Sequence, residues 1–331
     1  MFQKKKILIT GGTGSLGQAL TKSLLKENVD TIRIFSRDEL KQVQMNSQLK
    51  DDRLRFFIGD IRDKERLSRA LEDVDIVIHA AALKQVPVAE YNPFEAVKTN
   101  VYGAQNLIEA CLDKKIKLAI AVGTDKAVSP LNTYGATKLL MERLFVAANY
   151  WKGKNKINFL CVRYGNVLGS RGSAVPVFID QIKQGKKITI TDPSMTRFNI
   201  TMNQSIDLIF RAIKYGNGGE VFVPKLRAYR VGDMKDAIVD LMKSKSEVKI
   251  TGVRQGEKYH ESLINKEEVR NSFESKDDYI LIERSTQNSQ LLKKRGIKKS
   301  TLLEEYCSAN VKFLTKEELK KILIQEKIIL N

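Results

Sequence analysis

The 331-residue chain has few of the residues that build disulfide frameworks, zinc sites and aromatic nucleic-acid surfaces. It holds 3 cysteines, 2 histidines and 1 tryptophan, and the cysteines Cys111, Cys161 and Cys307 lie far apart. This spacing excludes a disulfide framework and a clustered metal site, and it fits a reducing compartment. We therefore expect a cytoplasmic protein without a bound metal.

The sequence also lacks long hydrophobic runs. No window approaches the roughly 20 apolar residues of a membrane span, so we expect no membrane association. The basic start is followed by a short apolar run that is too short for a signal peptide. With 42% hydrophobic residues, 20 glycines and 6 prolines, the composition is that of a globular protein and excludes fibrous and low-complexity classes.

Acidic residues are too few to balance the basic ones. The 57 Lys and Arg residues face 39 Asp and Glu residues, which gives a net charge of +18. A positive surplus of this size can mark a protein whose partner carries phosphates. The alternative is a lysine-rich surface in contact with solvent. The basic residues are scattered, without a zinc finger, basic zipper or arginine-rich stretch, so we expect no nucleic-acid partner.

In the first half, short apolar runs alternate with amphipathic stretches. The alternation predicts an α/β fold with a Rossmann-type, doubly wound parallel sheet, because each crossover helix must return over the sheet. Helices are expected at 16–25 and 64–71. Strands are expected at 6–10, 31–36, 54–59, 76–80, 118–123 and 158–163.

After about residue 170 the pattern loosens into a smaller mixed α/β domain. We expect domains at 1–170 and 171–331, with room for segments of the second to return to the first sheet. The Thr315-Lys316-Glu317-Glu318 spacing is that of a capping box and predicts a final helix. Other expected elements are helices at 175–184, 204–214 and 231–243, and strands at 187–191 and 219–223.

A glycine-rich turn separates the first strand from the first helix. Gly11, Gly14 and Gly17 are spaced as in dinucleotide-binding loops, with Thr13, Ser15 and Leu16 between them. Glycine lets the backbone turn tightly and approach a pyrophosphate, and the following helix offers its N-terminal amides to that anion. The position of the turn predicts a dinucleotide cofactor.

The end of the second strand distinguishes NADP from NAD. NAD-binding chains usually carry an acid there for the ribose 2'-hydroxyl, whereas this chain has Ser36-Arg37-Asp38 followed by Lys41. The Arg37 guanidinium suits a 2'-phosphate, with Ser36 and Lys41 assisting, and this favours NADP. Alternatively, Asp38 reaches the ribose or caps a helix while Arg37 faces solvent. Asp60 and Ile61, after the third strand, are expected beside the adenine.

Tyr134 and Lys138 are four residues apart in a stretch of helical character, so they share one helix face. An ammonium group beside a phenol stabilises the phenolate and lowers the tyrosine pKa. Tyr134 can then take the proton of a substrate hydroxyl as hydride leaves the same carbon. His79 closes an apolar strand, and we expect it to be packed near the cofactor rather than catalytic.

These features, with His79-Ala80-Ala81-Ala82 and Asn100, resemble the extended short-chain dehydrogenases/reductases. Over nearly the whole chain, the sequence is more closely similar to the inverting UDP-N-acetylglucosamine 4,6-dehydratases of pseudaminic acid biosynthesis. The motifs that carry this similarity are Ser36-Arg37-Asp38-Glu39-Leu40-Lys41, Ala82-Leu83-Lys84-Gln85-Val86-Pro87, Thr124-Asp125-Lys126-Ala127-x-x-Pro130, Arg163-Tyr164-Gly165-Asn166-Val167-x-Gly169-Ser170-Arg171-Gly172-Ser173, Thr191-Asp192-x-x-Met195-Thr196-Arg197-Phe198 and Arg254-x-Gly256-Glu257-Lys258.

The resemblance implies an NADP-dependent lyase that dehydrates UDP-N-acetylglucosamine. Tyr134 would deprotonate the 4-hydroxyl, Lys126 would take the carbon 5 proton, and Asp125 would protonate the departing 6-hydroxyl. Hydride would return to carbon 6, and reprotonation of carbon 5 from the opposite face would give UDP-2-acetamido-2,6-dideoxy-β-L-arabino-hex-4-ulose. Thr124 and Lys138 complete the implied catalytic set.

The same resemblance assigns binding residues and an assembly. Ala80, Ala81 and Val167 join the cofactor set, and the family tends to form homo-oligomers, often hexamers. Domain 1–170 would hold NADP and the catalytic residues, and domain 171–331 mainly the nucleotide sugar. The implied substrate residues are Lys84, Asn166, Arg171, Arg197, Arg254 and Glu257.

The Asp125-Lys126 pair separates the possible activities. Related retaining dehydratases usually carry Asp-Glu here and 4-epimerases carry small or hydroxyl residues, so the amine of Lys126 favours the inverting class. A non-inverting dehydratase, a UDP-sugar 4-epimerase and a cofactor-binding regulator are the alternatives. The sequence departs from the family pattern at Gly123, where the family has serine. Which group contacts the nicotinamide at this position is therefore not predicted.

Overall fold

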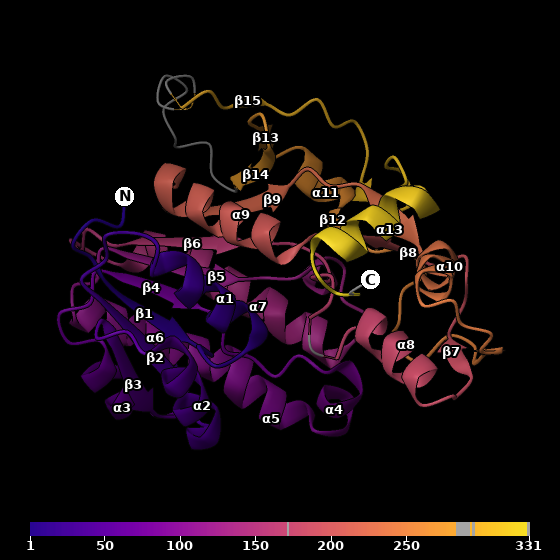
Figure 1. The fold of residues 1–331 in the computed structure, drawn as a ribbon. Helices are drawn as coiled ribbons and strands as arrows, with labels where there is room; N and C mark the ends of the chain where they lie inside the picture. The colour runs from indigo at the N-terminus through magenta and orange to yellow at the C-terminus, as the bar shows by residue number, and fades with distance from the viewer. Residues whose placement is uncertain (171, 283–291, 293–294, 330–331) are drawn as a thin grey trace.

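The computed structural model describes residues 1–170, 172–282, 292 and 295–329. Within these residues the central element is a ten-stranded sheet with the strand order β15-β13-β14-β9-β6-β5-β4-β1-β2-β3 (Figure 1). Strands β9 to β3 in this order are parallel, and β14, β13 and β15 continue the sheet antiparallel. The strands of this sheet are β1 (Lys6–Thr10), β2 (Thr31–Ser36), β3 (Leu54–Ile58), β4 (Ile76–His79), β5 (Leu118–Val122), β6 (Asn158–Val162), β9 (Glu220–Pro224), β13 (Ser272–Glu274), β14 (Asp278–Ile282) and β15 (Lys298–Lys299).

The order β3-β2-β1-β4-β5-β6 is that of a doubly wound dinucleotide-binding sheet, so the predicted Rossmann-type fold is confirmed. The six predicted strands of the first half all form, and each ends within one residue of its predicted end. Side chains alternate between the two faces of β1, where Leu8 belongs to one core and Ile7 and Ile9 to the other. Burial on both faces explains why these strands read as continuous apolar runs.

Helices cover both faces of the sheet. One face packs against α3 (Lys64–Ala70), α6 (Gly103–Asp113) and α7 (Thr133–Trp151). The other face packs against α1 (Ser15–Leu24), α2 (Glu39–Leu49) and α9 (Met202–Tyr215). Two buried layers therefore enclose the sheet and fix the loops at the carboxyl ends of its strands.

Several helices of the first half were not among the predicted elements. Helix α2 buries only Gln42 and Met45, so it has almost no apolar stripe to signal it. Gln42 Nε2 instead donates hydrogen bonds to the carbonyl oxygens of Ser36 and Phe57. Also unpredicted were α4 (Val86–Tyr91), α5 (Pro93–Val97), the π-helical segment η1 (Lys98–Tyr102) and α6, into which η1 leads.

The chain beyond residue 171 supplies a second lobe and also one edge of the sheet, formed by β9, β14, β13 and β15. The lobe has a core of its own, in which Phe178, Ile238 and Leu323 belong to three different helices. Figure 1 shows those helices, α8, α10 and α13, gathered beyond the end of the sheet. The lobe elements are α8 (Ala174–Lys183), β7 (Ile188–Ile190), β8 (Thr196–Phe198), β10 (Ala228–Arg230), α10 (Val231–Leu241), β11 (Val248–Ile250), β12 (Ser262–Ile264), α11 (Lys266–Val269), β16 (Tyr306–Cys307) and α13 (Lys316–Gln325).

The predicted capping box begins α13. Glu318 N donates to Thr315 Oγ1 at 3.3 Å, and Thr315 N donates to Glu318 Oε2 at 2.9 Å. Two otherwise unpaired amide groups at the helix start are thereby satisfied. The helices predicted at 175–184, 204–214 and 231–243 correspond to α8, α9 and α10.

Arg163 joins the sheet to the lobe from the end of β6. Its side chain is 1% exposed and donates to Glu142 of α7 at 3.0 Å and to the Leu263 carbonyl of β12 at 2.8 Å. It also donates two hydrogen bonds to Glu268 of α11, each at 2.9 Å. Because a buried guanidinium is costly unless it is fully paired, this network fixes α7, β12 and α11 relative to one another.

Candidate active site

A cleft of about 1590 Å³ lies between the carboxyl ends of the parallel strands and the second lobe. Ligands of doubly wound sheets bind at this edge because the strand order reverses there. Most predicted site residues line the cleft: Gly11, Thr13, Gly14, Ser15, Leu16, Gly17, Ser36, Arg37, Lys41, Ile61, Ala80, Ala81, Lys84, Thr124, Lys126, Tyr134, Lys138, Asn166, Val167, Arg197, Arg254 and Glu257. Asp60 and Asp125 are not among its lining residues, and Arg171 falls outside the described residues.

The glycine loop forms one end of the cleft. Gly11 has φ +67°, and a Cβ at this position would lie 2.8 Å from the amide nitrogen of Ala81, so only glycine fits between the ends of β1 and β4. Helix α1 begins after Gly14 without a side-chain cap, and its first-turn residues line the cleft. Free amides at a helix N-terminus suit the pyrophosphate of a dinucleotide.

The end of β2 presents a cation to the same cleft. The Arg37 side chain is 57% exposed, and its Nη1 lies 3.8 Å from Asp60 Oδ2. Asp38 caps α2 by accepting a hydrogen bond from Lys41 N at 3.0 Å, and it also pairs with Lys41 Nζ. Although burial acts to raise the pKa of Asp60, hydrogen bonds from Arg62 and the charge of Arg37 lower it. The acids near Arg37 are therefore both engaged by neighbouring groups of the protein.

The loop after β4 is held by Asn100 of η1. Asn100 accepts a hydrogen bond from Leu83 N at 2.8 Å and donates to the Leu83 carbonyl and to Thr137 Oγ1, each at 3.0 Å. This fixes the loop with Ala80, Ala81 and Lys84 against α7. His79 is fully buried, with its Nδ1 2.8 Å from Thr10 Oγ1, and burial followed by the charge of Lys138 lowers its pKa to about 3. A neutral, packed imidazole of this kind is structural.

Helix α7 brings Tyr134 and Lys138 into the cleft together. Asn132 caps the helix by accepting a hydrogen bond from Gly135 N at 2.8 Å. Burial lowers the pKa of Lys138 to about 8. Burial raises the pKa of Tyr134, while the charge of Lys126 and a hydrogen bond with Thr124 act in the opposite direction. The predicted fall in the tyrosine pKa is not found, because desolvation outweighs the charge of the nearby cation, which is Lys126.

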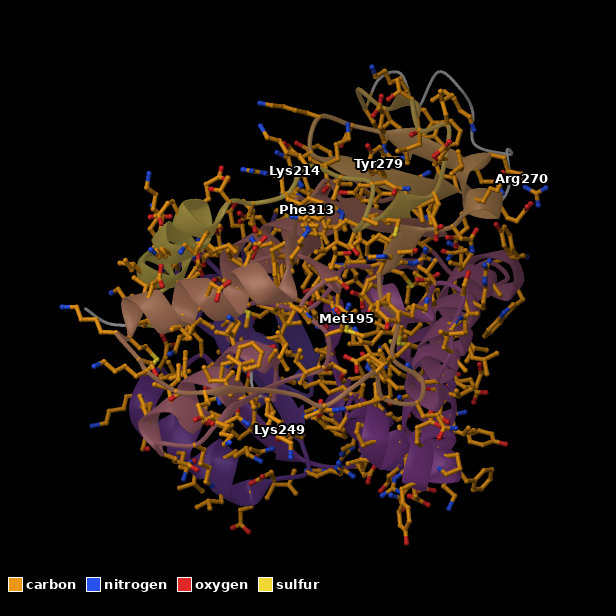
Figure 2. All side chains as sticks on the ribbon, turned by 90° about the vertical axis from the view of Figure 1, so that its right-hand side faces the viewer. Met195, Lys214, Lys249, Arg270, Tyr279 and Phe313 are labelled. Atoms are coloured by element: carbon orange, nitrogen blue, oxygen red, sulfur yellow. The ribbon has the colours of Figure 1, made fainter. Side chains whose placement is uncertain are left out.

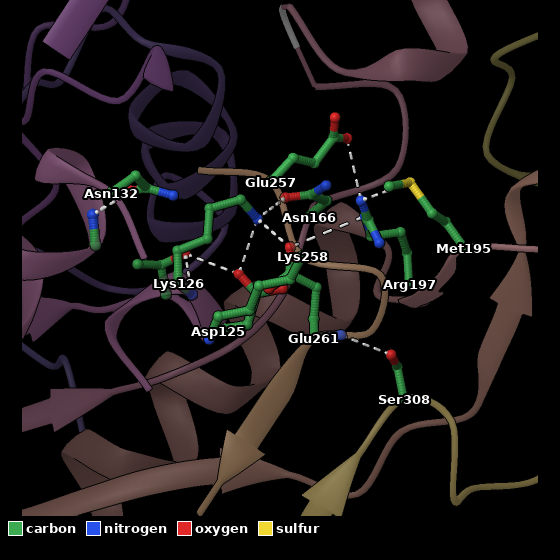
Figure 3. Close-up of polar contacts among 12 residues, drawn as sticks. Asp125, Lys126, Asn132, Asn166, Met195, Arg197, Glu257, Lys258, Glu261 and Ser308 are labelled. Atoms are coloured by element: carbon green, nitrogen blue, oxygen red, sulfur yellow. Dashed lines mark hydrogen bonds and ion pairs between the residues drawn. The ribbon is translucent and has the colours of Figure 1, made fainter. Parts of the chain in front are cut away.

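Lys126 has three polar partners in the site. Its Nζ lies 3.1 Å from Asp125 Oδ1, 3.1 Å from Asn166 Oδ1 and 3.2 Å from Glu261 Oε1 (Figure 3). These acceptors, in the described part of the chain, match the three N–H bonds of an ammonium group. Burial acts to lower the pKa of Lys126, but the Asp125 and Glu261 carboxylates outweigh it and raise the pKa. The resting site therefore holds Lys126 as an ammonium ion.

Asp125 follows β5 in the short 3-10 segment η2 (Asp125–Ala127) and is 1% exposed. Thr124 Oγ1 donates to Asp125 Oδ1 at 3.0 Å, and Asp125 N donates to the Tyr164 carbonyl at 3.0 Å. A Cβ on Gly165 would lie 3.0 Å from Asp125 Oδ2, so the glycine leaves room for the carboxylate. Backbone, hydroxyl and neighbouring glycine together fix this acid beside Lys126.

Gly123 occupies the position where the family pattern has serine. Its amide donates to the Val162 carbonyl at 2.6 Å, and a Cβ on Gly123 would lie 2.7 Å from that oxygen. A side chain here requires the two strands to separate. Glycine at position 123 thus permits the close approach of β5 and β6 at this point.

The cationic residues predicted for the substrate differ in exposure. Arg197 is 7% exposed and donates to Glu257 at 3.2 Å and to the Thr196 carbonyl at 2.8 Å. Its Nη2 also lies 3.6 Å from the sulfur of Met195. Figure 2 shows Met195 near the centre of the molecule, whereas the exposed Arg270 extends outward at its edge. Arg197 is thus an interior, ion-paired residue, whereas Arg254 and Lys84 are exposed residues at the cleft.

Sequence reasoning missed two buried groups of the cleft, Glu261 and Tyr229. Glu261 stands three residues after the Arg254 to Lys258 motif, so that motif read slightly further along the chain would have included it. Tyr229 is the register partner of Arg197 in the β8 and β10 pair, and burial raises its pKa. No local signal marks Tyr229, because its place depends on strand pairing.

Residues 7–283 match the sequence profile of the polysaccharide biosynthesis protein family. The chain belongs to this family. It is 48% identical over 283 residues to the inverting UDP-N-acetylglucosamine 4,6-dehydratase of Campylobacter jejuni, covering 85% of this chain and 84% of the relative. It is 43% identical over 329 residues to a UDP-glucose 4-epimerase of Rickettsia rickettsii, covering 98% of this chain and 96% of the relative.

Among solved structures, Pen from Bacillus thuringiensis has a TM-score of 0.93 and 38% identity, covering 99% of this chain and 100% of that one. The chain is therefore an enzyme of the dehydratase and epimerase kind within the extended short-chain dehydrogenases/reductases. The resemblance to the inverting dehydratases that the motifs indicated is confirmed by the Campylobacter relative. Within the described residues, no helix is both long and apolar enough to cross a membrane.

Proposed function

We propose that this enzyme carries out NADP-dependent 4,6-dehydration of UDP-N-acetylglucosamine with inversion at carbon 5. The product would be UDP-2-acetamido-2,6-dideoxy-β-L-arabino-hex-4-ulose, an early intermediate of pseudaminic acid or a related deoxyamino sugar. The observation that carries the proposal is the pair of buried Asp125 and largely buried Lys126 at 3.1 Å, with Lys126 and Tyr134 lining one cleft. The named Campylobacter relative supports it independently.

The first part of the chain fits a dinucleotide. The gap between Gly11 and Ala81 that a Cβ would fill, and the uncapped start of α1, suit the pyrophosphate. Arg37, Ser36 and Lys41 would hold a 2'-phosphate, which supports NADP rather than NAD. When bound there, NADP supplies reversible hydride transfer at carbons 4 and 6 of the sugar.

The acid and base roles require a particular distribution of protons. Tyr134 would take the 4-hydroxyl proton, Lys126 the carbon 5 proton, and Asp125 would give its proton to the departing 6-hydroxyl. The resting ammonium of Lys126 cannot act as a base, and an ionised Asp125 cannot act as an acid. One transfer resolves both problems: an Nζ–H bond of Lys126 breaks, an Oδ1–H bond of Asp125 forms across 3.1 Å, and the total charge is unchanged.

The substrate would enter from the second lobe. Arg254 and Lys84 are the exposed cations for the diphosphate, whose negative charge suits guanidinium and ammonium groups. Asn166 would contact the sugar beside Lys126, while Arg197 and Glu257 would shape the wall next to it. Arg171 belongs to the same proposed set. We also propose a cytoplasmic homo-oligomer, as the resemblance implies.

A UDP-sugar 4-epimerase is the second candidate, and the Rickettsia relative at 43% identity favours it. Epimerisation needs Tyr134 and the cofactor, but it removes no proton from carbon 5 and therefore needs no base at position 126. The ion pairs of Lys126 with the buried Asp125 and Glu261 argue against this candidate, because charged groups clustered in this way in a cleft are typical of functional sites.

Proton NMR of the enzyme with UDP-N-acetylglucosamine in deuterated water tests the proposal. A 6-methyl 4-keto product with deuterium and inverted geometry at carbon 5 is expected. A 4-epimer without deuterium at carbon 5 would establish the epimerase instead. Lys126→Met is expected to abolish the appearance of the 6-methyl signal.

Lys152→Met is a matched control for that substitution. Lys152 follows α7 at its C-terminal end and donates to the Ile157 carbonyl, away from the cleft. This variant is expected to keep the wild-type rate of 6-methyl formation. A Lys126→Met enzyme that still forms the inverted keto sugar would contradict the assignment of the base.

A further inference from the structure

Glu261 is a buried carboxylate whose backbone is fixed on both sides. Glu261 is 2% exposed and directly precedes β12. Glu261 N donates to Ser308 Oγ at 2.9 Å, and Ser308 N donates to the Glu261 carbonyl at 2.8 Å. Arg163 holds the Leu263 carbonyl two residues later at 2.8 Å. The direction of the Glu261 side chain is therefore set by contacts remote in sequence.

The carboxylate of Glu261 is directed at two cations of the cleft. Oε1 lies 3.2 Å from Lys126 Nζ and 3.9 Å from Arg197 Nε, and Figure 3 shows Glu261 beside Lys126. Oε2 is buried and has no hydrogen-bond partner among the described residues. Burial raises the pKa of Glu261, against the opposing charges of Lys126 and Arg197. An acid desolvated in this way is costly to the fold, so its retention needs a reason beyond stability.

Charged and titratable groups reach Lys126 from several elements of the described chain. They include Tyr134 from α7 and Tyr229 from β10. The closer charged groups are Asp125 from η2, Arg197 from β8 and Glu261 from the segment before β12, with Glu257 of that segment paired to Arg197. Three carboxylates thus face two cations, and the Glu261 carboxylate is not needed to neutralise Lys126, which Asp125 already contacts.

The geometry gives Glu261 a use once Lys126 is neutral. After the proposed proton transfer to Asp125, the amine of Lys126 retains two N–H bonds and one lone pair. Asn166 Oδ1 at 3.1 Å and Glu261 Oε1 at 3.2 Å remain as acceptors for those two N–H bonds. With both bonds occupied, Nζ keeps its place, and its lone pair faces Asp125 Oδ1, toward which the third N–H bond pointed. A base held in place in this way loses little entropy when the substrate binds beside it.

We propose that Glu261 is a positioning residue that acts through Lys126: together with Asn166 it holds Nζ in place beside Asp125 before and after the proton transfer. The inference rests on the proposed function, because it assigns Lys126 the role of base. The negative charge of Glu261 also stabilises the ammonium form of Lys126 in the resting enzyme. These two effects, on position and on charge, are separable by substitution.

Titration of the lysine side-chain nitrogens by ¹⁵N NMR tests the effect on charge without turnover. The Lys126 signal is assigned by its loss in Lys126→Met. Glu261→Gln keeps the size and an acceptor oxygen but removes the charge, so the titration midpoint of Lys126 is expected to fall by about 1 to 3 pH units. An unchanged midpoint would overturn the proposed link between Glu261 and Lys126.

The rate of deuterium incorporation at carbon 5, measured against pH, tests the effect on position. In Glu261→Gln the acid limb of the kcat profile should move to lower pH, because loss of a neighbouring negative charge lowers the pKa of Lys126. Glu261→Ala also removes the acceptor, and its highest kcat should fall about 100-fold while KM changes less than about threefold. Rescue of the highest kcat by Glu261→Gln relative to Glu261→Ala is the signature of positioning.

Glu274→Gln controls for loss of a buried, ion-paired carboxylate elsewhere. Glu274 is 4% exposed and pairs with Lys225 at 2.9 Å in the sheet. The Glu274→Gln substitution should leave the pH profile of kcat unchanged. If Glu261→Ala does not fold, Glu261→Gln carries the test alone through the two pH measurements.

The outcomes separate the two proposals. A wild-type enzyme that forms no keto sugar, but in which Glu261→Gln shifts the Lys126 titration, overturns the proposed reaction and leaves the charge link intact. A wild-type enzyme that forms the inverted product, with the acid limb and the highest kcat unchanged in both Glu261 variants, overturns the role of Glu261.

Discussion

The side-chain amide of Asn132 donates a hydrogen bond to the Gly256 carbonyl at 2.8 Å. The oxygen of the same side chain caps α7 by accepting from Gly135 N at 2.8 Å. One residue therefore connects the helix that carries Tyr134 to the loop that carries Arg254. The position of the proposed diphosphate site is thereby coupled to that of the proposed general base.

Asn132→Asp is expected to weaken substrate binding while it preserves the helix. Aspartate still caps α7, but it cannot donate to Gly256, so KM for the nucleotide sugar should rise about tenfold with little change in thermal stability. Asn132→Ala loses both contacts and should also lose about 1 kcal/mol of unfolding free energy. Steady-state kinetics and denaturant unfolding measure the two effects. An unchanged KM in Asn132→Asp would show that the loop is held by other contacts.

Gly123→Ala is expected to destabilise the enzyme. The added Cβ would lie 2.7 Å from the Val162 carbonyl, and overpacking of this kind costs about 1 to 3 kcal/mol. Urea unfolding of the variant beside the wild type measures the loss. Equal stability would mean that β5 and β6 separate at this point at little cost, and that serine at this position is equally tolerated.

Arg37→Ala should affect the two nicotinamide cofactors unequally. Hydrogen bonds from the guanidinium to a 2'-phosphate contribute about 1.5 to 3 kcal/mol, so the Kd for NADP should rise about 10- to 100-fold. The Kd for NAD should change little, because NAD lacks that phosphate. Isothermal titration calorimetry with both cofactors gives the comparison.

Arg55→Ala is a suitable control for Arg37→Ala, since Arg55 donates to the Asp52 carbonyl outside the cleft. Both cofactors should bind this variant with wild-type affinity. A similar loss of NAD and NADP binding in Arg37→Ala would argue against recognition of a 2'-phosphate.

Glu268 should make stability depend on pH in the acid range. Although burial acts to raise the pKa of Glu268, hydrogen bonds from Arg163 lower it. A carboxylate with a depressed pKa stabilises the fold fully above its unfolded pKa of about 4.3, and this contribution is lost as pH falls through the folded pKa. The free energy of unfolding should therefore decrease as the pH is lowered below about 4.3.

Glu268→Gln should reduce that pH dependence and lower stability at neutral pH by about 3 kcal/mol, since part of the buried Arg163 guanidinium loses its partner. The exposed neighbour Glu267, paired with Arg270 at 3.8 Å, supplies the control variant Glu267→Gln, which should leave stability and its pH dependence unchanged. Denaturant unfolding at several pH values makes the measurement. If the free energy of unfolding depends on pH in the same way in wild type and Glu268→Gln, Glu268 is not the source of the acid dependence.

Local patterns were sufficient for much of the fold. The strands of the first half are apolar runs buried on both faces, so their ends could be predicted to within one residue. Helix α2 was missed because its buried face consists of Gln42 and Met45, and Gln42 is held by hydrogen bonds rather than by apolar packing. Pattern reading detects apolar periodicity and has no access to such contacts.

The candidate site divides in the same way. The glycine loop and the Tyr134 to Lys138 spacing are local, and both line the cleft as their spacing indicated. Glu261 escaped notice because its partner Lys126 lies 135 positions earlier in the chain, as their numbering shows. Pairs so distant in sequence are brought together by the fold and leave no spacing to read.

The sequence by itself determined the positions of the first six strands, the glycine turn, and the motifs that identify the family, because each depends on residues close together in the chain. Tertiary structure alone decided the charge state of the site. Lys126 is held as an ammonium ion because Asp125 and Glu261, from separate segments, outweigh its burial. Tyr134 keeps a raised pKa because its desolvation exceeds the effect of the nearby cation. Desolvation and long-range charge depend on the packed environment, which exists only after folding.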